Sequence, residues 1–206
     1  LDSVPAQANP GVVLGATLAG LARDGRDKVT LALSPRLRAF GGWVARLLDD
    51  LAAGGDGGLL AVDDEPLGEP SAYGTDRVFV AVTLHGEDEL DAPLRALEAA
   101  GHPVLRTVLR DPLELGAEFF RWEVATVTAA TLLGINPFHE RAEQKARDSL
   151  EKLVRTYRLK KRLPELTVDC EEEGILLVSN QGTRPASVTD GLSAFLAEAD
   201  PGAHLA

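Results

Sequence analysis

Cysteine is nearly absent from this chain of 206 residues, which contains Cys170 alone. One cysteine excludes an internal disulfide and a zinc cluster built from cysteines, and it is typical of a reducing compartment. Long hydrophobic runs are also missing, so the sequence predicts no membrane-spanning helix. The chain starts at Leu1 without methionine and without a secretory leader. We therefore expect a cytoplasmic domain, cut from a longer polypeptide, that does not contact a membrane.

Positive charge is also scarce, with 21 lysines and arginines against 32 aspartates and glutamates and a formal net charge of −11. This charge repels phosphate backbones, so we expect no nucleic-acid partner. The exception is the segment 155–162, which gathers basic residues beside Tyr157. Two interpretations are open: a solvated helix end, where cations complement the helix dipole, or a contact for an anion or a partner.

The apolar pattern alternates between helical spacing and short β-branched runs. It predicts helices at 12–21, 35–51, 89–100, 112–133, 140–159 and 188–199. Strands are predicted at 28–33, 59–62, 77–84 and 103–109, with one or two more within 166–178. Alternating strands and helices with short connections favour an α/β fold, in which a parallel sheet lies between two layers of helices.

Two domains are expected: an α/β domain at 1–160 and a C-terminal α/β extension, 161–206, packed on the same domain. The extension is either a further unit on the sheet edge or a small appendage. The segment 132–138, Leu-Leu-Gly-Ile-Asn-Pro-Phe, forms a corner after the long helix. Gly134 can end that helix in a left-handed cap, and Pro137 prevents it from restarting at once.

Several polar residues are candidates for chemistry. Ser34 follows the first strand, where parallel sheets bind ligands and helix N-termini attract anions, although it could simply cap the next helix. His139 and Glu143 share a helix face but have no third ligand, so no metal is expected. Glu118 lies within the apolar corner helix and needs a partner, which is either Arg121 or a neighbouring loop.

Seven motifs, in order and at suitable spacing, resemble one known family. They lie at 25–35, 40–43, 65–67, 73–80, 100–104, 115–126 and 133–138. Together they resemble the C-terminal sugar-isomerase domain of glucose-6-phosphate isomerase, in the form that is fused behind a transaldolase in some bacteria. The resemblance implies a flavodoxin-like fold of three layers. It also implies interconversion of glucose 6-phosphate and fructose 6-phosphate through a cis-enediol, with a carboxylate base and without metal or cofactor.

When the family's site residues are carried over position by position, three of them differ in this sequence. The base position, a glutamate in the family, falls on Asp50, whose carboxylate is one methylene shorter. The active-site lysine falls on Arg147, which offers a cation but does not readily lend a proton. The glutamine beside the substrate falls on Glu140, whose charge disfavours a phosphorylated ligand. Ser34 remains a further candidate for substrate binding.

The expected partners follow from the same resemblance. They are a sugar phosphate, an N-terminal sugar-isomerase domain, a transaldolase domain of the same polypeptide, and a second copy in a homodimer. Two functions are open at this point. The chain is either part of an isomerase with altered activity, or a catalytically degenerate domain that binds a sugar phosphate or serves in oligomerisation. The changes at Asp50, Glu140 and Arg147 favour the second function.

Overall fold

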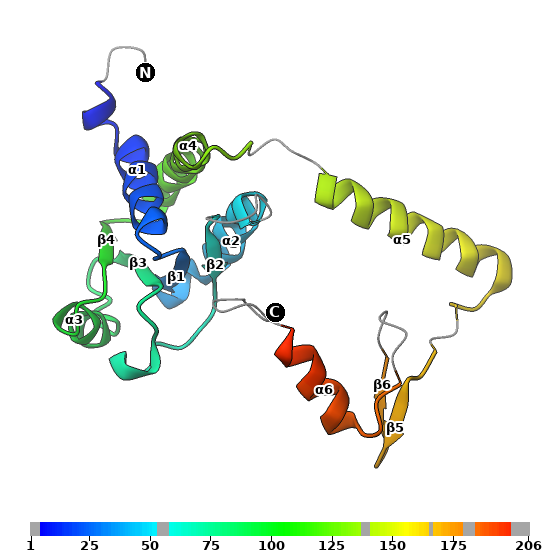
Figure 1. Ribbon diagram of the computed structural model, residues 1–206. Coiled ribbons are helices and arrows are strands. Elements are labelled where there is room, and N and C mark those ends of the chain that lie inside the picture. The colour runs from blue at the N-terminus through cyan, green and yellow to red at the C-terminus, as the bar shows by residue number, and fades with distance from the viewer. Residues whose placement is uncertain (1–4, 53–57, 137–140, 165–166, 179–183, 199–206) are drawn as a thin grey trace. The chain divides into compact units, whose positions relative to one another are not determined.

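The computed structural model describes residues 5–52, 58–136, 141–164, 167–178 and 184–198, apart from the side chains at 50, 52 and 141–146. The chain divides into two compact units, Leu1–Ala142 and Glu143–Ala206. The division lies earlier than the boundary at 160 that the sequence suggested. The helices and strands of both units are labelled in Figure 1.

A parallel sheet forms the centre of the first unit. Its strands are β1 (Lys28–Leu33), β2 (Leu60–Val62), β3 (Arg77–Leu84) and β4 (Val104–Leu109), in the spatial order β2-β1-β3-β4. All three pairings are parallel. The continuous apolar composition of β1 and β3 is that of strands covered on both faces. The predicted flavodoxin-like α/β fold is confirmed.

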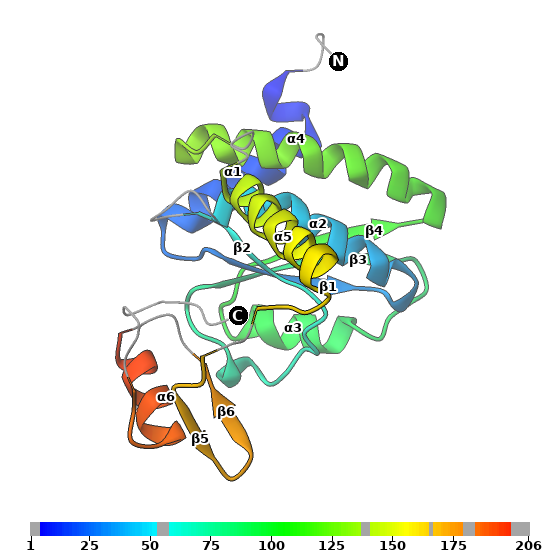
Figure 2. The same ribbon diagram turned by 90° about the vertical axis from the view of Figure 1, so that its right-hand side faces the viewer.

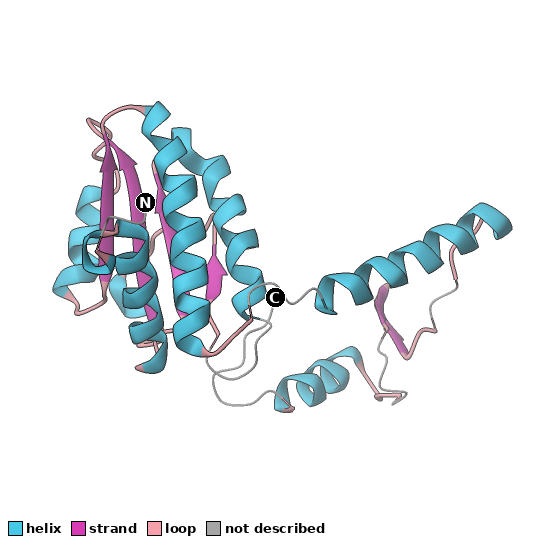
Figure 3. Cartoon of the chain, turned by 90° about the horizontal axis from the view of Figure 1, so that it is seen from above, coloured by secondary structure: helices cyan, strands magenta, loops and turns pink. Residues whose placement is uncertain are grey.

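Helices cover both faces of this sheet (Figures 1 and 3). One face packs against α1 (Pro10–Arg23), α2 (Arg38–Ala52) and α4 (Leu115–Leu133), which share the larger hydrophobic core with the strands. The other face packs against α3 (Asp91–Ala99) through Leu94 and Leu97, which contact a core that includes Phe79. Short 3-10 turns lie at Ala6–Ala8, Pro35–Leu37, Pro70–Ala72 and Pro112–Glu114.

The ends of α1 and α4 follow the sequence signals. Asn9 caps α1, because its side-chain oxygen accepts hydrogen bonds from the backbone N–H groups of Gly11 and Val12. Gly134, with φ 75°, is the predicted left-handed cap of α4. The N–H of Ile135 donates to the carbonyl of Ala130 at 2.9 Å, which completes the hydrogen-bond pattern of a Schellman motif.

The helix α5 (Arg141–Lys160) belongs to the second unit from Glu143 onward, and a hairpin and a final helix follow it. The hairpin pairs β5 (Cys170–Glu172) with β6 (Ile175–Leu177) antiparallel and forms a sheet of its own. The helix α6 (Val188–Ala197) is capped by Ser187, whose hydroxyl accepts from the N–H of Asp190 at 3.0 Å. Among the helices described in the two units, none has the length and apolar composition needed to cross a membrane.

Candidate functional site

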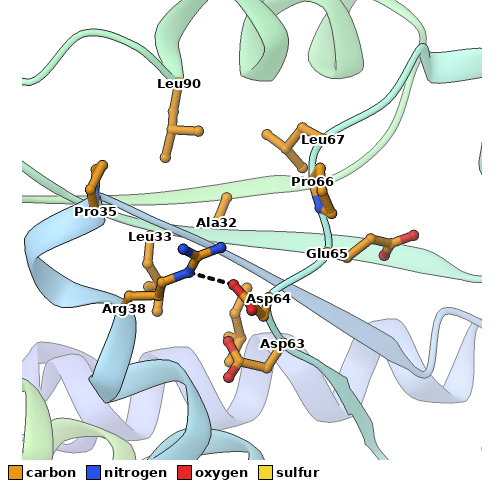
Figure 4. A pocket seen from close by; sticks show the side chains of 11 residues that line it. Ala32, Leu33, Pro35, Arg38, Asp63, Asp64, Glu65, Pro66, Leu67 and Leu90 are labelled. Carbon is orange, nitrogen blue, oxygen red and sulfur yellow. Dashed lines mark hydrogen bonds and ion pairs between the residues drawn. The ribbon is translucent and has the colours of Figure 1, made fainter.

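The carboxyl ends of β1 and β2 open into a pocket of about 250 Å³ (Figure 4). This edge of a parallel sheet is where open α/β folds bind ligands. The floor and walls are apolar, and the polar groups are one guanidinium and three carboxylates. The apolar lining is Leu31, Ala32, Leu33, Pro35, Pro66, Leu67 and Leu90, and the polar lining is Arg38, Asp63, Asp64 and Glu65.

Three acidic residues follow β2 directly and take three different directions. Asp64 has a left-handed backbone, with φ 58°, a conformation that aspartate tolerates better than most residues. Its carboxylate oxygen lies 2.5 Å from Nε of Arg38, the first residue of α2. Both side chains of this pair are exposed, 61% and 70% respectively, so the pair adds little stability. The pair joins the start of α2 to the loop after β2 (Figure 4).

Glu65 turns away from Asp64 and is held by an arginine of the sheet. Nη1 of Arg77 lies 2.7 Å from the Glu65 carboxylate and also donates to the hydroxyl of Thr30 at 2.7 Å. The same guanidinium lies over the ring of Tyr73, 5.5 Å from its centroid. Arg77 therefore fixes the loop after β2 to β1 and β3, and with it the position of the pocket wall.

The carboxylate of Asp63 fits against α2 because residue 41 of that helix is a glycine and has no Cβ atom. This carboxylate overlaps the position that a Cβ atom on Gly41 would take, whereas a Cβ on Gly42 would lie 3.8 Å away. The carboxylate of Asp63 thus packs against the helix backbone. This contact brings β2 and α2 together at the pocket.

Ser34 is buried, with 1% of its surface exposed. Its hydroxyl accepts a hydrogen bond from the N–H of Leu84 at 3.0 Å, and its own N–H donates to the carbonyl of Val82 at 3.2 Å. The side chain makes no cap to the following turn, so the capping interpretation is wrong. Ser34 instead ties the end of β1 to the end of β3, and a substrate-binding role stays a prediction.

The structure tests none of the three positions carried over from the family. Asp50 belongs to the last turn of α2, but its side chain lies outside the described residues. Arg147 is exposed on α5 and belongs to the second unit. Glu140 lies outside the described residues, as does His139. The catalytic and substrate-binding roles of these residues therefore stay predictions.

Glu118 finds the partner that the sequence suggested. This carboxylate is 6% exposed, and Nη1 of Arg121 lies 3.2 Å from its Oε1. The same Nη1 donates to the hydroxyl of Thr107 in β4 at 2.6 Å. Arg121 therefore joins α4 to the sheet, and Glu118 is the carboxylate paired with it. In the part of the chain that the structure describes, no group of three or more histidine, cysteine, aspartate or glutamate residues could hold a metal ion.

Motifs that are far apart in the sequence meet in two aromatic clusters. Phe40 and Trp43 of α2 pack on Phe119 of α4, with ring centroids 5.1 and 4.6 Å from the Phe119 ring. On the other face of the sheet, Tyr73 and His102 pack edge-on against Phe79, at 4.9 and 5.6 Å. These clusters contain residues from four of the seven motifs that suggested the family.

The sequence identified these motifs but not the pocket they support. The loop 63–75 has proline and glycine throughout and no periodicity, so its fold could not be predicted. One signal was present: three consecutive acids directly after a predicted strand lie at the carboxyl edge of a parallel sheet, where ligands bind. Asp63, Asp64 and Glu65 could have been chosen as site candidates on that ground.

No family model matches the chain, and no curated protein matches its sequence. Among solved structures, the chain is similar to a hypothetical protein from Thermus thermophilus, with a TM-score of 0.59 and 16% identity. The match covers 72% of this chain and 46% of that chain, so this chain spans less than half the length of its structural neighbour. At this identity, the likeness supports the three-layer fold and nothing beyond it.

Proposed function

We propose that this chain is a sugar-isomerase domain of the glucose-6-phosphate isomerase type, part of a longer cytoplasmic protein, and that it has altered or lost the isomerase chemistry. In that reaction a base removes the proton beside a carbonyl and returns it to the neighbouring carbon. Asp50 holds the base position, and Arg147 holds the position of the cation that would stabilise the developing charge on oxygen. Glu140 and Ser34 are the proposed substrate contacts.

The observation that carries this proposal is the meeting of the motifs in space. Four motifs of the resemblance pack together in two pairs, one pair around Phe119 and the other around Phe79. The motifs at 65–67 and 25–35 join the second pair, because Arg77 bonds to both Glu65 and Thr30. Short motifs that match by chance have no reason to pack together, whereas motifs that define one fold do. The flavodoxin-like sheet is also the architecture that the family implies.

The charge of the pocket favours the second candidate, a catalytically degenerate domain. Three carboxylates line it, and the two guanidinium groups beside them, Arg38 and Arg77, are already paired with Asp64 and Glu65. A phosphate group placed there would meet excess negative charge. Carboxylates suit sugar hydroxyls, which donate hydrogen bonds to them. The pocket of this domain is therefore better suited to contacting sugar hydroxyls than to binding phosphate. The domain could equally serve as a scaffold.

A coupled assay for conversion of fructose 6-phosphate tests the catalytic role of Asp50. If Asp50 is the base, Asp50→Asn abolishes activity, while Asp49→Asn leaves it unchanged. Asp49 is the matched control because it is the exposed neighbour on α2 and pairs with Arg46 at 3.5 Å. Activity that survives Asp50→Asn rules out the base role.

Unfolding in the presence of 6-phosphogluconate separates the two candidates when no activity is found. A ligand of the native state at 100 times its dissociation constant stabilises the fold by about 2.7 kcal/mol. Stabilisation without catalysis supports a degenerate domain that still binds sugar phosphate. An unfolding curve that does not respond to the ligand supports a scaffold or oligomerisation role.

A further inference from the structure

One carboxylate of the pocket at the ends of β1 and β2 lacks a partner among the residues that the structure describes. Asp64 is paired with Arg38, and Glu65 is paired with Arg77. No described residue donates a hydrogen bond to the half-buried carboxylate of Asp63 or forms an ion pair with it. The wall after β2 therefore retains an uncompensated negative charge, and this charge lies at Asp63.

Packing against α2 holds Asp63 in this position. Its carboxylate lies on the backbone of Gly41, in the first turn of that helix. A helix N-terminus carries only about half of an elementary positive charge, so it does not neutralise a carboxylate. A neutral molecule that filled the pocket would remove water from Asp63 and leave its charge unpaired, which is costly. A positively charged group that donates hydrogen bonds would replace the water and compensate the charge.

The rest of the pocket is apolar and has room for a small ring. Leu31 and Leu33 belong to β1, Leu67 belongs to the loop after β2, and Leu90 precedes α3. Because α2 and α3 cover opposite faces of the sheet (Figure 2), the lining comes from both sides of the sheet edge. An apolar cavity of about 150 Å³ accommodates benzene. This pocket measures about 250 Å³, so it has space for such a ring and a short polar arm.

We propose that this pocket binds a small organic cation, a protonated amine on an apolar body of about the size of a benzene ring. The ammonium group lies beside Asp63 and Asp64, and the apolar body packs on the leucines of the lining. Because the pair of Asp64 and Arg38 is exposed, the ammonium can share Asp64 at little cost. The apolar lining thus determines the body of the ligand, and the uncompensated carboxylate determines its charge.

This site goes beyond the proposed sugar-isomerase function and does not depend on it. Sugar hydroxyls donate hydrogen bonds to carboxylates but leave the charge of Asp63 uncompensated, whereas an ammonium group donates and also compensates the charge. Asp50, Glu140 and Arg147 take no part in the binding of the amine. A lack of isomerase activity therefore has no bearing on this site, and binding of an amine here has none on the catalytic role of Asp50.

Three probes with the same ring and different charges test the ligand class on the 206-residue chain at pH 7. They are benzylamine, benzyl alcohol and benzoate, titrated to millimolar concentrations and followed by NMR of labelled leucine methyl groups. We expect benzylamine to shift the signals of the four lining leucines in a saturable way, with roughly tenfold higher affinity than benzyl alcohol. Benzoate should not bind, because the pocket repels an anion. Leu192, on α6 of the second unit, is the control for nonspecific binding.

Two substitutions should change the affinity for benzylamine in opposite directions. Asp63→Asn keeps the shape of the side chain and removes its charge, so it should lower this affinity roughly tenfold and leave the affinity for benzyl alcohol unchanged. Arg38→Gln removes the cation that competes for Asp64, so it should raise the affinity for benzylamine. Asp88→Asn is the matched control for the change in net charge, because Asp88 is exposed and lies outside the lining.

The exposed position of Arg38 keeps the test decisive if Asp63→Asn does not fold. Benzyl alcohol that binds as tightly as benzylamine overturns the proposal, and so does benzylamine that shifts none of the lining leucines or shifts Leu192 equally. A preference for benzylamine that survives Asp63→Asn, or an affinity that Arg38→Gln does not raise, also overturns it.

Discussion

The carboxylate of Asp63 packs on the backbone of Gly41, so that the loop after β2 rests directly on α2. Gly41→Ala forces this carboxylate to rotate away. Alanine itself favours a helix over glycine by about 1 kcal/mol. We therefore expect Gly41→Ala to be less stable than Gly42→Ala by about 1 kcal/mol in urea unfolding, because a Cβ at Gly42 stands clear of Asp63 at 3.8 Å.

Repeating both glycine substitutions in a chain that also carries Asp63→Ala separates the effect of this contact from the effect of helix propensity. Without the carboxylate, alanine at either glycine position gives the same gain in the free energy of unfolding. A difference that persists between the two alanine variants in that background would show that the strain at Gly41 has a source other than Asp63.

Ser34→Ala tests whether this serine holds the sheet together. The change removes the acceptor for the N–H of Leu84, which is buried with it. An unsatisfied buried donor costs about 1 to 3 kcal/mol, and we expect that loss in the free energy of unfolding. Ser71→Ala, at an exposed serine of the loop, should change it by less than about 0.5 kcal/mol. Loss of 6-phosphogluconate binding with unchanged stability would assign Ser34 to the ligand instead.

Arg121→Met tests the pairing beneath α4. The variant leaves the Glu118 carboxylate buried without its cation, and removing one partner of a buried pair typically costs about 3 kcal/mol. We expect a loss of that order, partly recovered in the double variant with Glu118→Gln, which removes the stranded charge. Arg95→Met breaks an exposed pair with Asp91 and should cost less than about 1 kcal/mol. No recovery in the double variant would mean that Arg121 acts through its packing.

Hydrophobic spacing was sufficient to predict the elements of the first unit. The strands predicted at 28–33 and 77–84 match β1 and β3 residue for residue. The cap at Gly134 was also predictable, because the conformation of a helix end depends on the residues next to it. Such features are local, so a single sequence determines them.

The pocket was not predictable because its determinants are distant in sequence. Ser34 bonds to Leu84, fifty residues away, and not to the turn that begins beside it. The wall after β2 takes its shape from Arg77 and from the cluster of Tyr73, Phe79 and His102. Neither contact has a local signature. Sequence reasoning therefore identified Ser34 as a candidate with two interpretations, and the structure rules out the side-chain cap while substrate binding stays a prediction.

The pair of Lys28 and Asp76 makes stability depend on pH at the acid end. Nζ of Lys28 lies 3.1 Å from Asp76 and 2.9 Å from Asp27. Burial alone would raise the pKa of Asp76, but the hydrogen bond and the charge of Lys28 outweigh it and lower the pKa below its ordinary 3.8. A lowered pKa in the folded state stabilises the fold above the unfolded pKa, and this contribution disappears as the pH falls through the folded value.

Asp76→Asn should therefore destabilise the protein at pH 7 and have no effect once the carboxylate is protonated. Because 37% of the Asp76 side chain is exposed, solvent screening limits the loss at pH 7 to about 0.5 to 1 kcal/mol. Urea unfolding at a series of pH values should show the two curves converging below pH 3.8. Asp88→Asn, at an exposed aspartate, is the control that should follow wild type throughout. A constant difference between Asp76→Asn and wild type across the series would show that the carboxylate does not act through its charge.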